Sequence, residues 1–449
     1  MPYVLDRMDE VPNPSPTSQS GRVSTCGSVG LSGAAFVFEA APFFLPTPDA
    51  DFVASTFRQD YTKISKHSLA IWGKEFMGFR FVHSSDIHLA KPFGRFDEDT
   101  RGRLREARFQ SISRLATVAR EAGAAHVLLA GDIFDAETPP PQIIRQALRE
   151  IQAADDITWV VMPGNHDSLA ASDLWTRMRR ECPPNAILAL EPKPLSLGEG
   201  VVILPAPPTA RDPGRDLTGW FGEAASGDAV RVGLAHGGVQ DFGAEEGGLA
   251  VIAPNRAEIA DLDYLALGDW HGQMKISPRC WYSGAPEADN FKPQARPGCL
   301  VVDIPARGAM PDVRPVETGV FSWTGGEVDM RVGDDVGDVL GHALPRQDRR
   351  QALVSLSIKG RLTLSEQAAL IGEIAGLHDD FAFFECDHSM VEIEQEPGDL
   401  DEIDSGGALR AAADDLFGQA ESDTLDDEAR KAARDALSRL FQFAREEQA

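Results

Sequence analysis

Five short polar clusters, each directly following an apolar run, constrain the fold of this 449-residue chain more than any other feature. They are Asp86-Ile87-His88, Gly131-Asp132-Ile133-Phe134-Asp135, Gly164-Asn165-His166-Asp167, Ala235-His236-Gly237-Gly238 and Gly268-Asp269-Trp270-His271. The carboxyl ends of strands in an open α/β sheet converge on one crevice, so residues far apart in the sequence can meet there. We therefore predict a fold in which all five clusters border a single site.

The segment Phe79–Glu317 alternates strand and helix patterns. The first three apolar runs end at polar clusters, and between them apolar residues such as Leu104, Ala107 and Ile112 recur at helix spacing. Pro139–Pro141 opens the second helix, where a missing N–H does little harm. This βαβαβ beginning predicts an α/β fold with parallel strands covered by helices. Shorter Gly- and Pro-rich connections in the second half predict a mixed core of two sheets.

Residues 1–76 differ in composition from the rest of the chain. Gly, Pro and Ser supply 17 of the first 50 residues and no apolar periodicity persists, so we expect a disordered or loosely attached leader. Met77 immediately precedes the first convincing strand, and an alternative is that the true start lies there and the leader is a gene-model artefact. In either case the α/β catalytic domain is expected to span residues 77–320.

Two further units are predicted after the α/β domain. Residues 321–395 are expected to form a small α+β accessory (capping) domain. Val354–Ile358 alternates like a half-buried strand, a helical pattern covers Ser365–Gly376, and another strand is expected near Phe381–Phe384. Residues 396–449 are acidic, and the pattern predicts a helix-loop-helix with helices at Ala408–Phe417 and Leu425–Glu446.

The composition indicates a globular protein without a membrane span. The hydrophobic fraction is 43% and the charged fraction 25%, and the most apolar stretch, Val29–Pro46, is interrupted by Glu39 and Pro42. Five scattered cysteines form no CxxC pair, which argues against a disulfide framework or a zinc-thiolate site and favours a reducing, cytoplasmic location. The net charge of −27 disfavours adhesion to DNA or anionic membrane by charge alone, although bound metal ions can supply the positive charge that a nucleic-acid enzyme needs.

The residue types in the clusters point to metal chemistry. Carboxylate, imidazole and amide side chains suit divalent ions of the Mn, Fe or Zn kind. Asp86 and His88 lie on the same side of an extended segment and can bind one ion. Any one cluster is more typical of a turn or a cap, and a single buried histidine such as His236 is more typical of a hydrogen-bonded core residue. Five clusters in this order together predict a metal site.

These clusters resemble the five signature motifs of the calcineurin-like metallophosphoesterases. Within that superfamily the strings HSSDIHL, LLAGDIFD and PGNHD most resemble the SbcD-type DNA repair exonucleases, which act in double-strand-break repair. The segment Tyr282–Pro286 matches the Tyr-x-Gly-Ser-Pro loop of that family, with Ala285 in place of Ser. The resemblance implies a two-sheet sandwich flanked by helices, and it extends more loosely to the accessory domain and the C-terminal helices.

By position, the resemblance implies a site for two divalent metal ions, with Mn²⁺ as the expected metal. It assigns a first ion to Asp86, His88 and His271, a second ion to Asn165, His236 and Asp269, and a bridging position to Asp132. In such sites two ions roughly 3.5–4 Å apart polarise the phosphoryl group and activate the attacking water.

The resemblance gives His166 and Asp167 roles other than metal binding. His166 would lie beside the metals, stabilise the charge on the phosphoryl group and help to protonate the leaving oxygen. Asp167 either orients that imidazole, as acids commonly do in catalysis, or caps a turn. Asp135 is expected to support the site or the fold without binding metal.

One position departs from the family pattern. The last motif is usually Gly-His-x-His, whereas here it is Gly-Asp-Trp-His, so Asp269 stands where the family has a ligand histidine. Asp269 either binds the second ion, adding negative charge and a harder oxygen donor, or turns away and caps the loop beside Trp270.

The resemblance implies an exonuclease that hydrolyses DNA phosphodiester bonds from 3′ to 5′ with an SbcC-like coiled-coil ATPase as partner. The alternatives are a small-nucleotide phosphodiesterase or phosphatase, and a metal-bearing scaffold for the ATPase. A homodimer is left open. The apolar stripe from Leu425 to Ala444 either docks on the ATPase or packs on its own domain. A row of arginines on the first helix either follows phosphates or forms a solvated face: Arg101, Arg103, Arg105, Arg108, Arg114 and Arg120.

Overall fold

The computed structural model describes residues 78–198, 200–240, 251–291, 297–394 and 407–446. The predicted leader, Met77 and the predicted boundary at residues 395–396 lie outside these ranges. The chain divides into two compact units, residues 1–73 and 74–449, and every described residue belongs to the second unit.

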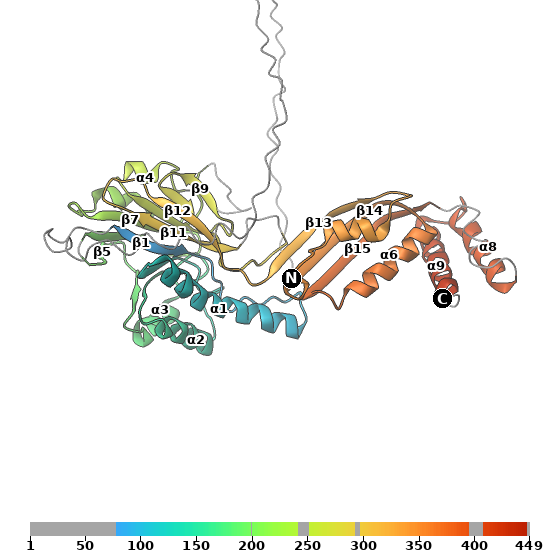
Figure 1. The fold of residues 1–449 in the computed structure, drawn as a ribbon, viewed down its shortest axis with the longest axis horizontal. Coiled ribbons are helices and arrows are strands. Elements are labelled where there is room, and N and C mark those ends of the chain that lie inside the picture. The colour runs from blue at the N-terminus through green and yellow to red at the C-terminus, as the bar shows by residue number, and fades with distance from the viewer. Residues whose placement is uncertain (1–77, 199, 241–250, 292–296, 395–406, 447–449) are drawn as a thin grey trace, which may run out of the picture. The chain divides into compact units, whose positions relative to one another are not determined.

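The first sheet of the described part of the chain has the strand order β12–β11–β1–β2–β3–β4 (Figure 1). Its strands are β1 (Phe79–Ser84), β2 (His126–Ala130), β3 (Thr158–Met162), β4 (Ala186–Leu188), β11 (Gly298–Ile304) and β12 (Asp312–Glu317). Strands β1 to β4 run parallel, and β11 pairs antiparallel with both β1 and β12.

The second sheet has the order β5–β6–β7–β8–β10–β9. Its strands are β5 (Leu195–Ser196), β6 (Val201–Ala206), β7 (Val230–His236), β8 (Tyr264–Gly268), β9 (Met274–Ser277) and β10 (Cys280–Tyr282). The four central strands are parallel, whereas β5 and β9 pair antiparallel at the edges.

Alternate residues of the two sheets share one buried core. Phe81 and Leu128 of the first sheet and Val232 and Tyr264 of the second belong to the same apolar cluster. Because side chains alternate between faces along a strand, the opposite face of the first sheet is free to pack on helices. These are α1 (Glu98–Ala122), α2 (Pro141–Ala153) and α3 (Ser172–Glu181), which lie together on one side of β1 in Figure 1.

The outer face of the second sheet carries only short helical segments in the described part of the chain. They are η1 (Gly219–Glu223) and α4 (Arg256–Ile259), which pack with β6, β7 and β8 in a separate apolar cluster. The predicted two-sheet sandwich flanked by helices is therefore confirmed.

Local signals explain where the main helices begin and end. The Asp97 carboxylate accepts a hydrogen bond from the Thr100 backbone N–H at the start of α1, and Gly123 ends that helix in the left-handed conformation, which glycine adopts without steric cost. Helix α2 begins with Pro141 at its first position, as the proline run predicts.

A third sheet of three parallel strands follows. It contains β13 (Ser322–Met330), β14 (Ala352–Thr363) and β15 (Phe383–Glu394), with α5 (Val336–Ala343), η2 (Arg349–Gln351) and α6 (Leu364–Leu377) between the strands. The expected strand and helix fall within β14 and α6. Strand β15 is longer than the expected strand near residues 381–384, and β13 and α5 were not predicted.

The chain continues with two helices, α8 (Ala408–Ala420) and α9 (Asp427–Glu446). The apolar stripe of α9 packs on its own chain, because Leu437, Phe441 and Ala444 share a buried cluster with Leu364 of α6 and Ala413 of α8. Of the two interpretations of the stripe, the structure therefore shows internal packing for these residues.

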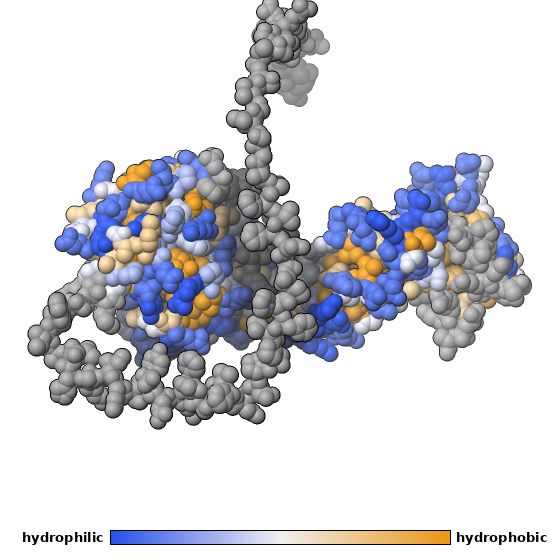
Figure 2. All heavy atoms as spheres, turned by 45° about the horizontal axis from the view of Figure 1, so that its top comes forward, coloured by the Kyte–Doolittle hydropathy of each residue, from blue (hydrophilic) through white to orange (hydrophobic). Residues whose placement is uncertain are grey.

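None of the helices in the described ranges is both long enough and apolar enough to cross a membrane. Hydrophilic residues cover much of the face that Figure 2 displays, and apolar patches interrupt them. Large apolar side chains that are exposed among the described residues include Ile259, Met310, Met390 and Phe443.

Candidate metal centre

The five polar clusters occupy the carboxyl ends of strands in both sheets. Asp86 and His88 follow β1, Asp132 follows β2 and Asn165 follows β3, all in the first sheet. In the second sheet, His236 is the last residue of β7, and Asp269 and His271 follow β8. The site therefore lies where the same ends of the two sheets meet.

Three groups of side chains have potential ligand atoms within 4.8 Å of one another. One group is Asp86, His88 and His271, which is the set assigned to the first ion. A second joins Asp86 and Asp132 to His236, and a third joins His88 to Asp135 and His166. The groups share members, so the predicted residues form one continuous cluster.

The backbone at the site is not extended, contrary to the argument that placed Asp86 and His88 on one side of a strand. Strand β1 ends at Ser84, and the two residues have φ angles of 55° and 49°. Asp132 and Asp269 also have positive φ angles, of 54° and 104°. Such conformations are uncommon for residues other than glycine and concentrate at functional sites, where surrounding contacts maintain them.

Glycines beside the site residues allow the clusters to approach closely. A Cβ atom on Gly131 would lie 2.3 Å from His236 Nδ1, and one on Gly164 would lie 2.0 Å from Asp132 Oδ1. No larger residue fits at either position without moving a site residue. Gly131 is thus required by packing against the second sheet, and Gly164 by packing against the loop that follows β2 in the first sheet.

Each of the three histidines assigned to metal has its Nδ1 atom beside an oxygen acceptor. His88 Nδ1 lies 3.2 Å from Asp135 Oδ1, and His271 Nδ1 lies 3.2 Å from Asp289 Oδ2. His236 Nδ1 donates to the Ala130 carbonyl at 2.7 Å. An acceptor at Nδ1 leaves the Nε2 lone pair free to bind metal, and this arrangement is usual for metal-binding histidines.

The Nε2 atoms of these histidines point toward one another and toward Asp132. His88 Nε2 and His271 Nε2 are 3.1 Å apart. Asp132 Oδ2 lies 3.7 Å from His88 Nε2 and 3.4 Å from His236 Nε2, so a single oxygen stands between the first and second ligand sets. This is the position that a bridging carboxylate must occupy.

Buried polar atoms without a hydrogen-bond partner indicate whether the site suits a cation. Among the described residues, Asn165 Oδ1 and His236 Nε2 are buried and have no hydrogen-bond partner. Buried polar atoms usually have a partner, because leaving one without costs about 1–3 kcal/mol. An oxygen, an imidazole nitrogen and nearby carboxylates together suit a divalent transition metal, so the residues fit the implied ions.

Asp269 faces this part of the site. Its Oδ1 atom accepts a hydrogen bond from Asn165 Nδ2 at 3.0 Å and lies 3.8 Å from His236 Nε2. Its backbone N–H points to the Asp86 carboxylate, 3.2 Å from Oδ1. The geometry therefore favours a side chain turned into the site over one that caps the loop beside Trp270.

The carboxylates of the site favour positive charge on the histidines beside them. Burial opposes protonation of His236, yet the carboxylates of Asp132, Asp86 and Asp269 raise its pKa well above the usual value. Burial also lowers the pKa of His271, but its contact with Asp289 dominates and raises the pKa to about 9. The carboxylates of the site thus stabilise positive charge at this position, which is the sign of charge that a bound cation has.

His166 lies beside the cluster and is oriented by the main chain of Asp135. Its Nδ1 atom donates to the Asp135 carbonyl at 3.0 Å, and its ring stands nearly perpendicular to that of His88 with centroids 4.9 Å apart. Its backbone N–H donates to Asp132 Oδ1 at 2.9 Å.

Asp167 makes its hydrogen bonds elsewhere. Its carboxylate accepts from the backbone N–H groups of Ile133, Phe134 and Gly164 at 2.6–3.0 Å. Burial, followed by the charge of Asp132, raises the pKa of Asp167 to about 7. The structure thus gives Asp167 the turn-capping contacts, and the contact expected to orient His166 comes from Asp135 instead.

Asp289 borders the site and was not predicted, whereas Arg108 was expected to follow phosphates or to lie on a solvated face and is instead buried beside the site. Asp289 contacts His271 from a loop after β10, where no strand end marks its position in the sequence. Arg108 of α1 is buried and donates to the Ile87 carbonyl at 2.5 Å. Of the other arginines in that row, Arg114 pairs with Glu287 and Arg120 with Asp156, so these three are engaged within the domain.

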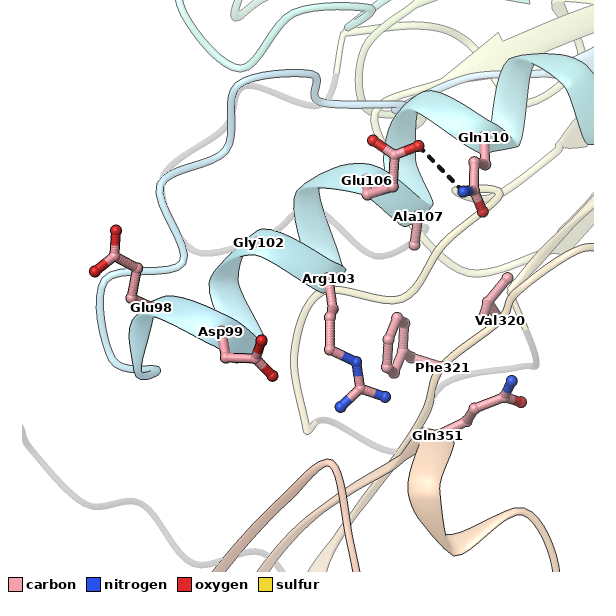
Figure 3. A pocket seen from close by; sticks show the side chains of 10 residues that line it. All are labelled: Glu98, Asp99, Gly102, Arg103, Glu106, Ala107, Gln110, Val320, Phe321 and Gln351. Atoms are coloured by element: carbon pink, nitrogen blue, oxygen red, sulfur yellow. Dashed lines mark hydrogen bonds between the residues drawn. The ribbon is translucent and has the colours of Figure 1, made fainter.

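Figure 3 shows a pocket in which the first turns of α1 face Val320, Phe321 and Gln351. It has a volume of about 760 Å³. Arg103 extends beside the Phe321 ring there, at 5.3 Å from its centroid. No predicted site residue lines this pocket.

A comparison with protein families agrees with this geometry at the level of the domain. Residues 79–302 match the family model described as calcineurin-like phosphoesterase. The chain is also similar to a solved structure, TT1561 of Thermus thermophilus, with 10% sequence identity and a TM-score of 0.34 over 54% of this chain and 99% of that one. No curated protein matches the chain.

Proposed function

Because residues 79–302 form a calcineurin-like metallophosphoesterase domain, we propose that this chain is a DNA repair exonuclease with a site for two Mn²⁺ ions. The family supports metal-dependent hydrolysis of a phosphoester as the reaction class. The proposal adds DNA as substrate, cleavage from 3′ to 5′, an SbcC-like ATPase partner and a cytoplasmic location. The substrate, the direction of cleavage and the partner rest on the resemblance of the strings HSSDIHL, LLAGDIFD and PGNHD, and the location rests on the scattered cysteines.

The observation that carries the proposal is the position of Asp132 between two sets of inward-facing ligand atoms. In this assignment Asp86, His88 and His271 bind the first ion, and Asn165, His236 and Asp269 bind the second. Oδ2 of Asp132 is close to histidine Nε2 atoms of both sets. When bound, two such ions polarise a phosphoryl group and activate water for in-line attack.

His166 is the proposed proton donor to the leaving oxygen. Its Nδ1–H is held by the Asp135 carbonyl, so Nε2 is the atom left to carry a proton toward substrate. Its backbone contact with Asp132 couples its position to the bridging carboxylate. The imidazole therefore stays next to the phosphoryl group without being a ligand.

A second candidate substrate is a small nucleotide. The net charge of −27 disfavours a polyanion, and several α1 arginines that could have followed phosphates are paired within the domain. A small phosphodiester needs only the metal centre, so it remains compatible with this charge.

The proposed ATPase partner would dock on the C-terminal helices through side chains that the chain leaves exposed. Leu409 of α8 is 44% exposed and Phe443 of α9 is 64% exposed, whereas Phe441 is buried. We expect Phe443→Asp to abolish co-purification with an SbcC-like ATPase while hydrolysis of a small phosphodiester stays unchanged. Undiminished co-purification would refute this docking surface.

The function is tested by assaying purified protein with Mn²⁺ on 3′-labelled duplex DNA, 5′-labelled duplex DNA, single-stranded DNA and cyclic nucleotides. We expect stepwise release of nucleotides from the 3′ end, abolished by His166→Ala. Hydrolysis confined to cyclic nucleotides would establish the second candidate. Metal binding without hydrolysis of any of these substrates would support a scaffold.

A further inference from the structure

We propose that Asp289 is a positioning residue for the first ion. Its buried carboxylate contacts Nδ1 of His271, on the side of the ring away from the site, and Arg108 and Lys91 contact the same carboxylate. This inference rests on the proposed metal site and extends it to a network that lies outside the ligand set. It assigns a function to the loop between β10 and β11, which carries none of the five clusters.

The contact between Asp289 and His271 fixes which ring nitrogen faces the site. Both carboxylate oxygens lie within 3.3 Å of His271 Nδ1, and the side chain of Asp289 is 2% exposed. A carboxylate can only accept, so Nδ1 must donate, and in the neutral imidazole that binds metal the lone pair is then on Nε2. That lone pair is directed toward the Nε2 atom of His88, 3.1 Å away, where the first ion would be bound.

Arg108 connects Asp289 to the other two ligands of the first ion. Its Nη1 atom donates to the carbonyl of Ile87, the residue between Asp86 and His88, and its Nη2 atom lies 3.6 Å from Asp289 Oδ2. Its guanidinium group also lies over the Phe93 ring, at 5.4 Å from the centroid. One buried arginine thus contacts the loop of two ligands and the acid that orients the third.

Lys91 completes the network from its half-buried side. Its Nζ atom lies 2.5 Å from Asp289 Oδ2, the same oxygen that contacts His271. Two cations therefore share one buried carboxylate, and removing that carboxylate would leave them unpaired beside a metal ion. Unpaired buried charge is strongly unfavourable, and here it would also repel the ion.

The second ion has no equivalent network among the described residues. His236 is oriented by the Ala130 main-chain carbonyl, which no side-chain substitution removes. The two ions can therefore be compared within one protein, because a side chain orients His271 and the main chain orients His236. Loss of the Asp289 carboxylate should weaken the first ion and leave the second nearly unchanged.

The test is titration of metal-free protein with Mn²⁺, followed by calorimetry and by electron paramagnetic resonance of free Mn²⁺. Removing a group that orients a metal-binding histidine typically lowers metal affinity about 10–100-fold. We expect Asp289→Asn to weaken one of two Mn²⁺ ions by about this factor and to change the other less than about threefold. Asp289→Glu, which keeps the charge, should recover part of the loss.

Two further variants separate positioning from general stabilisation. Asp156→Asn breaks an exposed ion pair with Arg120 of α1, the helix that also carries Arg108, and should leave both affinities unchanged. In a His271→Ala background, Asp289→Asn should lose most of its effect, because the acid acts through that ring. An equal loss of affinity for both ions, or an undiminished effect in the His271→Ala background, would overturn the inference.

If Asp289→Asn does not fold, Lys91→Met tests the network from its half-buried end. Removing this cation should strengthen the first ion a few-fold, because Lys91 both occupies Asp289 Oδ2 and repels the ion. Unchanged affinity for both ions would contradict the network, as would a wild-type protein that binds no divalent ion. A wild-type protein that binds two ions in this pattern but leaves DNA intact would refute the proposed nuclease and leave the role of Asp289 standing.

Discussion

The metallophosphoesterase domain buries a group of charged side chains at one site, whereas the described C-terminal part of the chain, residues 322–394 and 407–446, has its ion pairs at the surface. In the domain, Asp86, His88 and Asp132 are buried together at strand ends, with exposures of 2% or less. In the C-terminal part, pairs such as Lys359–Glu327 and Arg361–Glu392 lie at the surface. Buried charge is costly and persists where it is paired or binds metal, whereas exposed pairs contribute little. The difference supports chemistry in the first region, and the structure shows packing for the second.

The largest expected effect breaks the metal centre. Asp132→Ala removes the oxygen that lies between the two ligand sets, so it should release both ions and lower turnover roughly 10⁴-fold or more. Metal content after dialysis and hydrolysis of a small phosphodiester measure the two effects. The control is Asp387→Ala in exposed β15, which should change neither. Retention of both ions by Asp132→Ala would contradict the bridging assignment.

The next effect separates proton transfer from metal binding. His166→Ala should keep both ions, because Nδ1 of His166 donates to the Asp135 carbonyl and the proposal assigns this ring to neither ion. Turnover should fall about 10²–10⁴-fold, the usual loss when a general acid is removed. Metal analysis and steady-state kinetics on the same sample distinguish a loss of turnover from a loss of metal. A His166→Ala protein without metal would assign His166 to the ligands instead.

The C-terminal part should respond in stability and not in catalysis. Phe441 is fully buried between α9 and α6, so Phe441→Ala should cost about 3–5 kcal/mol of unfolding free energy. Phe443→Ala removes an exposed ring two residues away and should cost less than about 0.5 kcal/mol. Thermal and denaturant unfolding measure the difference. Loss of small-phosphodiester hydrolysis in the folded Phe441→Ala protein would show that the two regions are not separable in this way.

The smallest expected effect is a pH dependence of the unfolding free energy. Its origin is a histidine buried in the core between the two sheets. His83 is buried, its Nδ1 accepts from the Tyr264 hydroxyl, and its Nε2 donates to the Leu267 carbonyl. Burial lowers the pKa of His83 to about 3, so the unfolded chain binds this proton more readily at intermediate pH. Stability should therefore be intact above about pH 6.5 and fall by about 1.4 kcal/mol per pH unit below it.

The variant His83→Gln isolates this contribution. Its unfolding free energy should lack that component of the slope between about pH 6 and 4, as measured by urea denaturation at each pH. Identical slopes for wild type and variant would show that His83 does not limit stability in acid.

The fold and the neighbourhood of the site were predictable because both follow from short-range patterns. Apolar runs at β1, β2 and β3 end in polar clusters, and the rule that parallel strands share one carboxyl edge places those clusters together. The family pattern then indicated which members lie in which set. The departure from the family pattern at Asp269 was visible in the sequence. Whether its side chain points into the site could be decided only once the structure showed Asn165 and His236 beside it.

The features that could not be predicted depend on contacts between distant segments. Asp289 and Arg108 lie in a loop and on a helix, and neither position has a periodic signal that points to the site. The left-handed backbone at Asp86 and His88 follows from hydrogen bonds to Gly131 and Asp132 on the neighbouring strand's loop. Strand β13 was missed because adjacent glycines weaken its pattern, although pairing with β14 over its whole length stabilises it.

Anomalous scattering from crystals grown with Mn²⁺ tests the central claim, a two-ion site built across both sheets, most directly. We expect two peaks roughly 3.5–4 Å apart, with Asp132 between them, His88 and His271 at one peak and Asn165 and His236 at the other. A single peak, or peaks that Asp132 does not join, would contradict this account.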